Sequence, residues 1–390
     1  MGMNDRDLAA SLAKLARGPR AVSVQPAPRT GGSKIHVGFL SRYFRNHTIG
    51  RLMAGVIGAL ARQRFLVTVL SVGQADDEGG RRIRQAADRY VVLPAQLGPA
   101  LQIVAGQGLD ILYYADLGMD PFTYTLAFTR CAPVQCVTWG HPLTTGIPTM
   151  DYFVSSEDLE TAGAQAHYTE KLARLKTLNV YYDRVAAPAP LKDRGFFGLP
   201  DRAHVYACPQ TLFKFHPDFD DVLGQILRRD PQGILVLIEG KYPRWRELLL
   251  DRLRRTCGDV IDRIRFVHRQ SRDNYLKLLT VSDVLLDPLH FGGGNSSYEA
   301  LGLGVPIVAL PSEFLRGRIT YAQYRKMGVM DCVVHNTEEY VQRAVELGVD
   351  RDRRQAVGRK IREANAALFE DPMAVRELEA FFESVAPRQS

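Results

Sequence analysis

A glycine-rich segment from Asp287 to Pro306 contains the residues best suited to bind a charged ligand. A predicted strand ends at Asp287, and a predicted helix begins at Asn295-Ser296-Ser297. The free N–H groups and dipole of a helix start suit a diphosphate, and the flanking Gly293 and Gly294 permit close backbone approach. Glu299, one turn further on, can accept the hydroxyls of a ribose. A capped helix after a glycine turn fits the pattern equally well. The glycine spacing gives little support to a dehydrogenase or an ATPase.

A second candidate follows another predicted strand, at Ala207–Pro217. Here Lys214 can place a compact positive charge on a leaving diphosphate, and Thr211 lies one helical turn before it. Taken alone, the segment is better explained by a surface lysine ahead of a helix that begins at Pro217.

Two polar loops follow strands in the first half of the chain. His47, in the loop Ser41–Leu52, can act as a general base near neutral pH, although a lone histidine is more often a capping or loop residue. The loop Thr138–Gly146 carries three further polar candidates, which an ordinary turn would also explain: His141, Thr144 and Thr145.

Alternating apolar strands and helices are expected to position these residues. The predicted strands of the first half are 35–41, 65–72, 90–94, 110–115, 134–138 and 152–155, with helices at 50–62 and 80–88. The predicted strands of the second half are 204–209, 234–239, 264–267, 284–287, 306–310 and 332–334. This pattern predicts two doubly wound parallel sheets, whose ligands bind beyond the carboxyl ends of the strands.

The chain of 390 residues is long enough for two such domains. We expect an N-terminal helix (4–17) and a linker (26–33) within residues 1–33, and a Rossmann-like domain at 34–199, which ends in an irregular connection from about 161. A second Rossmann-like domain is expected at 200–350. Terminal helices (351–369 and 373–386, within 351–390) are expected to pack across the domain boundary.

Composition narrows the functional classes. The net charge of +7 admits a polyanion, but the arginines of 228–272 alternate with acids at helical spacing and match no nucleic-acid-binding signature. No apolar run is long enough for a membrane helix, and no signal-peptide core opens the chain, so a cytoplasmic protein is expected. The five cysteines lack metal-site spacing and are expected to be buried.

The polar loops together resemble the catalytic region of the O-linked N-acetylglucosamine transferase and Spindly family, in its bacterial form. The resemblance runs from about Ile35 to the C-terminus. It rests on strings that occur in the family's order: Val37–Ser41 with Asn46-His47-Thr48, Trp139–Pro142 with Thr144-Thr145-Gly146, Met150–Tyr152, Leu212–Lys214, and Gly294–Ser297 with Glu299 and Gly304–Pro306.

The resemblance implies a GT-B fold and an inverting, metal-independent transfer, with the donor in the C-terminal domain and the acceptor entering from the N-terminal side. It places His47 at the reacting face, Lys214 on the diphosphate, Asn295, Ser296 and Ser297 at the phosphate, and Glu299 on the ribose. Arg318 also matches a family position. The absence of an Asp-x-Asp motif at a predicted strand end agrees with metal independence.

Two departures from the family bear on specificity. Asn295-Ser296-Ser297 replaces the histidine and two threonines of animal members, and Glu299 replaces an aspartate. The long tetratricopeptide superhelix is missing, with only the helix at 4–17 as a candidate remnant.

We therefore expect a glycosyltransferase that moves a sugar to a Ser or Thr hydroxyl of a protein or peptide, without a cofactor. UDP-N-acetylglucosamine is the expected donor, with UDP-glucose or a GDP-sugar as alternatives. A hydrolysing nucleotide-sugar 2-epimerase and a non-catalytic nucleotide-sugar-binding protein are the rival functions.

Overall fold

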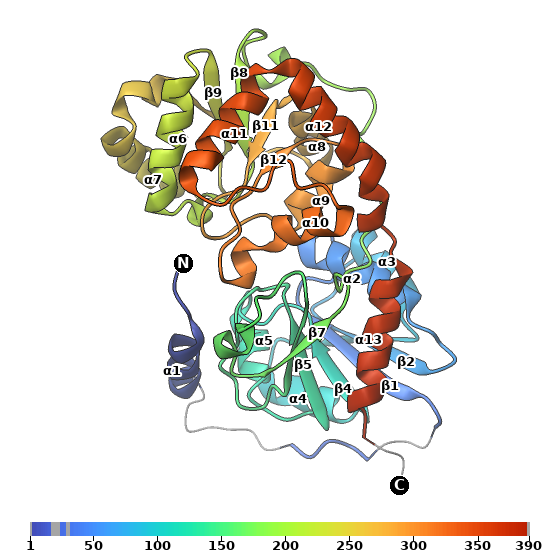
Figure 1. Cartoon of the computed structure of the whole chain (residues 1–390). Coiled ribbons are helices and arrows are strands. Elements are labelled where there is room, and N and C mark those ends of the chain that lie inside the picture. Colours follow the sequence, from blue (N-terminus) through green and yellow to red (C-terminus); the bar gives the residue numbers. More distant parts are fainter. Residues whose placement is uncertain (1, 17–23, 29–31, 388–390) are drawn as a thin grey trace. The chain divides into compact units, whose positions relative to one another are not determined.

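The computed structural model describes residues 2–16, 24–28 and 32–387, which form two compact units. The N-terminal unit combines residues 3–183 with 370–390, and the C-terminal unit is built from Arg184–Phe369. Each unit has its own parallel β-sheet with helices against it (Figure 1). This is the α/β architecture that the alternating sequence pattern predicts.

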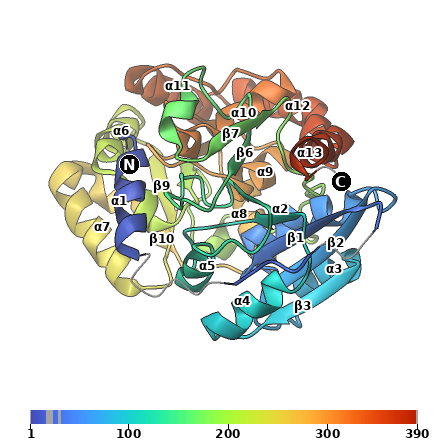
Figure 2. The ribbon, with the colours of Figure 1, turned by 90° about the horizontal axis from the view of Figure 1, so that it is seen from below.

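The N-terminal sheet has seven strands in the order β3-β2-β1-β4-β5-β6-β7. Figure 2 shows β3, β2 and β1 side by side at one edge of this sheet. The strands are β1 (Ile35–Ser41), β2 (Phe65–Val72), β3 (Arg89–Leu93), β4 (Ile111–Tyr114), β5 (Val134–Thr138), β6 (Tyr152–Ser156) and β7 (Lys171–Leu175). The helices of its main segment are α1 (Arg6–Ala16), α2 (Thr48–Ala59), α3 (Glu78–Ala86), α4 (Leu97–Ala105) and α5 (Pro121–Leu126).

The last two helices divide between the units. Helix α12 (Arg351–Ala364) belongs to the C-terminal unit, whereas α13 (Pro372–Val385) belongs to the N-terminal unit. The Glu379 carboxylate at α13 accepts a hydrogen bond from the Ala61 N–H at 2.6 Å. Phe382 of the same helix packs edge-on against Phe39 of β1 and Tyr113 of β4. The chain therefore returns to its N-terminal unit at its end.

The C-terminal sheet has five strands in the order β10-β9-β8-β11-β12. The strands are β8 (His204–Cys208), β9 (Gly233–Ile238), β10 (Ile264–Val267), β11 (Val284–Leu286) and β12 (Ile307–Val308). The helices are α6 (Pro217–Arg229), α7 (Pro243–Thr256), α8 (Arg272–Val281), α9 (Asn295–Gly302), α10 (Ile319–Met327) and α11 (Thr337–Val349), followed by α12.

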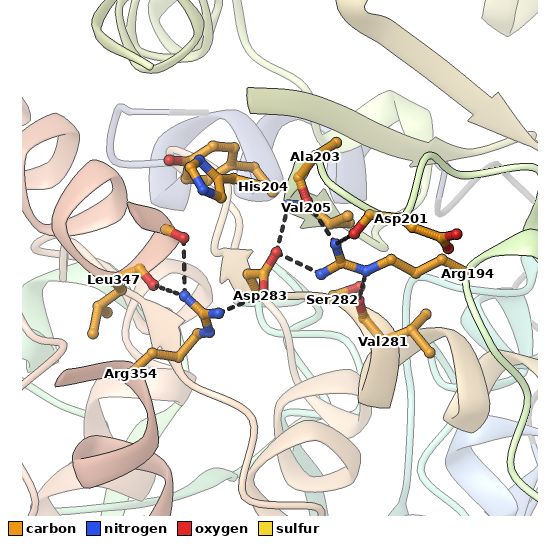
Figure 3. Close-up of polar contacts among 12 residues, drawn as sticks. Arg194, Asp201, Ala203, His204, Val205, Val281, Ser282, Asp283, Leu347 and Arg354 are labelled. Atoms are coloured by element: carbon orange, nitrogen blue, oxygen red, sulfur yellow. Dashed lines mark hydrogen bonds and ion pairs between the residues drawn. The ribbon is translucent and has the colours of Figure 1, made fainter. Parts of the chain in front are cut away.

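A buried carboxylate fastens the amino ends of the central strands in this unit. Asp283, just before β11, accepts hydrogen bonds from the Val205 N–H and from Arg194, both at 2.7 Å. Its other oxygen lies 2.9 Å from Arg354 of α12 (Figure 3). Removing either arginine would leave a buried charge partly unpaired, which is strongly destabilising.

Two predictions about elements are wrong. Residues 332–334 form no strand, although Cys332 and Val334 are buried: a single bridge joins Val333 to Ala309, and the chain then turns into α11, which Asn336 caps. The region 161–199, expected to be irregular, contains the edge strand β7 paired with β6. Residues 29–31 of the expected linker and residue 17 of the expected first helix lie outside the described residues.

Candidate functional site

The loop between β11 and α9 is shaped by the carboxyl group of Asp287. Its Oδ1 accepts a hydrogen bond from the Gly293 N–H at 2.6 Å, and burial raises the pKa of this carboxyl to about 6. A Cβ atom on Gly293 would lie 2.3 Å from the Ser297 Oγ and 2.7 Å from the Ser296 Oγ. Glycine is therefore required where the loop folds back onto the start of α9.

Lys214, in the segment after β8, contacts the loop between β11 and α9. The lysine ends a 3₁₀ turn (Leu212–Lys214) after β8, and its Nζ donates to the Gly292 carbonyl at 2.7 Å and to Gln210 Oε1 at 3.0 Å. Nζ also lies 4.3 Å from the ring centre of Phe291. Burial lowers the pKa of Lys214 to about 8, so the ammonium form still predominates at neutral pH. A positive charge thus lies against the glycine loop, at the carboxyl end of the sheet.

The polar side chains at the start of α9 have different environments. Ser296 Oγ is half-buried and accepts from Gln210 Nε2 at 2.5 Å. Ser297 is buried and shares a 2.8 Å hydrogen bond with Thr320. Asn295 Oδ1 is buried and has no hydrogen-bond partner among the described residues. Ser296 is thus linked through Gln210 to Lys214, whereas Ser297 ties α9 to α10.

Two other expected donor-side residues, Glu299 and Thr211, and the family-matched Arg318 make different contacts. Glu299 is buried, with Oε1 3.6 Å from the Nε of Arg272 at the start of α8. Thr211 is exposed at the beginning of the 3₁₀ turn that carries Lys214. Arg318 donates to the Ser312 carbonyl at 3.1 Å, just before α10.

In the N-terminal unit, His47 caps helix α2. Its Nδ1 accepts a hydrogen bond from the Ile49 N–H at 3.2 Å, and its ring stacks on Tyr43 at 4.4 Å between centres. Burial, with smaller contributions from Arg45 and Arg51, lowers the pKa of His47 to about 4. The ring is therefore neutral at pH 7, and because Nδ1 is the acceptor, its proton is on Nε2. The Nε2–H of His47 is thus a hydrogen-bond donor that the cap does not use.

His141 lies close to the loop that follows β4. Gly118 approaches it so nearly that a Cβ there would lie 2.4 Å from the ring carbon Cδ2, and Gly118 has a φ of +107°, which glycine alone adopts readily. Burial lowers the pKa of His141, which favours the neutral ring. The loops after β4 and β5 are thereby packed against each other.

The two expected acceptor-side threonines are occupied by an internal partner. Thr144 Oγ1 donates to one Glu170 oxygen at 2.6 Å, and the Thr145 N–H donates to the other at 2.8 Å. The Thr145 hydroxyl also donates to Glu170. All three residues are buried. These contacts give the threonines a role in ordering the loop after β5.

Several residues of the site did not emerge from sequence reasoning. Gln210 and Asp287 lie within the candidate segments but were not singled out. Glu170 lies 25 residues from Thr145, which it orders. Asp116, just after β4, is buried and accepts a hydrogen bond from Ser41 at the end of β1. A polar residue one or two positions after a strand was the only available signal for Asp116 and Gln210.

A cavity of about 550 Å³ lies at the opposite, amino ends of β8, β11 and β12, lined by residues that include Arg194, Asp283 and Arg354. Its central charges are already paired with one another (Figure 3). The region around Lys214 is therefore the better candidate for the ligand site, because ligands of open parallel sheets bind at the carboxyl ends of the strands.

Two parallel α/β sheets, with a lysine and a glycine-bordered helix start at the carboxyl end of the second, define a GT-B type glycosyltransferase architecture. The chain belongs to glycosyl transferase family 41, whose family model matches residues 21–183 and 179–377.

Individual relatives agree with this assignment. An O-GlcNAc transferase structure from Thermobaculum terrenum is similar over 97% of this chain and 73% of its own, with 28% identity and a TM-score of 0.80. The Arabidopsis thaliana protein named probable UDP-N-acetylglucosamine–peptide N-acetylglucosaminyltransferase SEC is 26% identical over 91% of this chain and 37% of its own length. A UDP-glucose:protein N-beta-glucosyltransferase of Actinobacillus pleuropneumoniae serotype 7 is 26% identical over 67% of this chain and 42% of its own. The chain thus spans less than half the length of these two curated relatives.

Two further predictions are answered by the described residues. All five cysteines are buried free thiols, as expected from their spacing. Within the described ranges, none of the helices is both long and apolar enough to cross a membrane.

Proposed function

We propose that this chain is an inverting, metal-independent glycosyltransferase that moves a sugar from a nucleotide-sugar to a Ser or Thr hydroxyl of a protein or peptide. The observation that carries the proposal is the meeting of Lys214 with the glycine loop and the start of α9. Membership of family 41 supports the same class of reaction.

The donor's diphosphate would bind at this meeting point. The Nζ of Lys214 and the free N–H groups of α9 supply positive potential where charge grows as the sugar leaves. Asp287 and Gln210 hold the loop and the lysine in place beforehand. Such preorganised groups stabilise the leaving diphosphate more than they stabilise the bound substrate.

His47 is proposed to act on the acceptor side as a neutral Nε2–H donor. The cap that Nδ1 makes to Ile49 supports this role over that of a general base, because a base at Nε2 would need the ring proton on Nδ1 and would lose the cap.

UDP-N-acetylglucosamine is the donor we propose, with UDP-glucose as the alternative. The Arabidopsis relative is named for UDP-N-acetylglucosamine and the Actinobacillus relative for UDP-glucose. Neither name decides between them for this chain, and a GDP-sugar stays among the donors to be tested.

The experiment is a thermal-shift panel of UDP-N-acetylglucosamine, UDP-glucose and GDP-sugars, followed by transfer to a Ser/Thr peptide library read by mass spectrometry. A ligand at 100 times its dissociation constant stabilises its unit by about 2.7 kcal/mol. A shift with one donor, lost in Lys214→Ala, and a sugar on the peptide support the proposal. UDP released with an altered sugar and no acceptor would instead identify a 2-epimerase. Binding without any turnover would leave a nucleotide-sugar-binding protein.

A further inference from the structure

Three potential metal ligands converge where α6 begins. His216 is the N-cap of α6, Asp218 lies in its first turn, and His290 comes from the distant β11–α9 loop. His290 Nε2 lies 2.8 Å from Asp218 Oδ2, and His216 Nδ1 lies 3.3 Å from Asp218 Oδ1. One ligand atom from each residue lies within 4.8 Å of the others.

We propose that His216, Asp218 and His290 bind one divalent transition-metal ion, with zinc as the ion that fits best. Two imidazoles and a carboxylate are ligands that zinc prefers, at bond lengths of about 2.0–2.2 Å. Tetrahedral geometry at that length separates neighbouring ligand atoms by about 3.3 Å. The 2.8 Å and 3.3 Å contacts involve different oxygens of Asp218, so side-chain rotations must bring both imidazole nitrogens to this separation from each other and from the one ligating oxygen. The three ligand atoms already lie within 4.8 Å of one another. Water would complete the coordination.

A bound ion would replace contacts that these residues already make with one another. His216 Nδ1 accepts a long, 3.3 Å hydrogen bond from the Asp218 N–H, and a metal ion would take the same lone pair. The side chains of both histidines are a little over one quarter exposed, and that of Asp218 is more than half exposed. An ion can therefore enter from solvent without unfolding the segment.

The ion would act as a clamp on the donor loop. His216 lies two residues after Lys214, and His290 lies two residues before Gly292, whose carbonyl accepts from Lys214. A bound ion would hold these two segments together at a second point. It would stabilise the loop without entering the transfer, which is consistent with metal-independent turnover.

The test is a cobalt and zinc titration of the full, untagged chain without donor or acceptor. We expect one Co²⁺ per chain with the visible absorption of a four-coordinate site, displacement by Zn²⁺, and a higher thermal midpoint with zinc. His290→Ala and Asp218→Asn should each weaken binding by at least about tenfold, because each removes one ligand. His268→Ala is the matched control: His268 pairs with Glu239 at 2.6 Å in the same unit, outside the cluster, and its loss should change nothing.

Absence of saturable binding by the wild-type chain would overturn the proposal. So would equal binding by wild type and His290→Ala, which would place the ion elsewhere. Because neither measurement uses a nucleotide-sugar, failure here leaves the proposed transferase function intact. Conversely, a chain that binds zinc at these residues but transfers no sugar would refute only the function.

Discussion

The ammonium group of Lys214 lies 2.7 Å from the carbonyl oxygen of Gly292, and this contact joins the segments that follow two neighbouring strands, β8 and β11. The carbonyl and Gln210 Oε1 hold Nζ at one place in the loop. A charge fixed in this way needs little reorganisation when a diphosphate leaves.

Lys214→Ala should therefore lower kcat by about 10²–10³-fold, with a smaller change in donor affinity. The measurement is steady-state transfer together with calorimetric binding of the donor. Lys241→Ala, an exposed lysine of the same unit, serves as the control and should retain full activity. An unchanged rate in Lys214→Ala would move the phosphate site elsewhere.

Ser296 and Ser297, at the start of α9, should have different roles: Ser296 in donor binding and Ser297 in stability. Ser296→Ala should weaken UDP binding in calorimetry, since Ser296 Oγ is half-buried beside Gln210. Ser297→Ala should instead lower the free energy of unfolding by about 1–3 kcal/mol, because the buried Thr320 hydroxyl loses its 2.8 Å partner. Equal effects of both variants on UDP affinity would contradict this division.

Turnover should survive excess EDTA, because Lys214 and the α9 dipole supply the positive charge that a metal ion would otherwise provide. Initial rates before and after chelation, with and without added manganese or magnesium, provide the measurement. His290→Ala should behave as wild type toward EDTA, since the proposed zinc site lies outside the transfer step. Activity that is lost on chelation in both wild type and His290→Ala, and restored by manganese or magnesium, would reject the mechanism.

Local pattern in the sequence predicted much of the fold and of the donor loop. Buried apolar strands such as β1 and β5 have unmistakable boundaries, and the glycine run before Asn295 marks a helix start directly. The apolar pattern did not predict strand β7, because it is a half-exposed edge strand with lysine and arginine among its apolar residues. Long-range partners were equally hidden: nothing near Thr145 indicates that Glu170 occupies its hydroxyl. The ring nitrogen that His47 uses as a cap likewise depends on three-dimensional geometry.

Asp116 should make the stability of the N-terminal unit fall as the pH rises. Burial raises the pKa of its carboxyl from 3.8 to about 7, so between these values the folded state holds a proton that the unfolded chain has released. The stabilisation is complete below about pH 4 and is lost as the pH passes 7. Each pKa unit corresponds to about 1.4 kcal/mol, which gives an upper bound of about 4 kcal/mol.

Asp116→Asn should flatten this dependence, because an amide does not titrate. Trp139 lies in the N-terminal unit and Trp245 in the other, so fluorescence in a Trp245→Phe background reports the N-terminal unit alone. Denaturant midpoints between pH 5 and 8 give the slope, and the exposed Asp76→Asn is the control. A wild-type slope identical to that of Asp116→Asn would show that the carboxyl is already ionised in the folded state.

His47 offers a way to separate helix capping from chemistry. Asparagine is among the best N-cap residues, so His47→Asn should keep the cap on the Ile49 N–H and remove only the imidazole, whereas His47→Ala removes both. We expect both variants to transfer sugar at least about 10²-fold more slowly, the lower end of the range for a positioned proton-bearing side chain. Only His47→Ala should lose about 1 kcal/mol of stability.

Because the pKa of His47 is lowered to about 4, wild-type transfer should show no acidic limb from this residue near pH 6.5. Full activity in His47→Asn would show that His47 serves only as the N-cap of α2. An acidic limb of the pH–rate profile near pH 6.5 that disappears in His47→Asn would instead show that His47 acts as a general base.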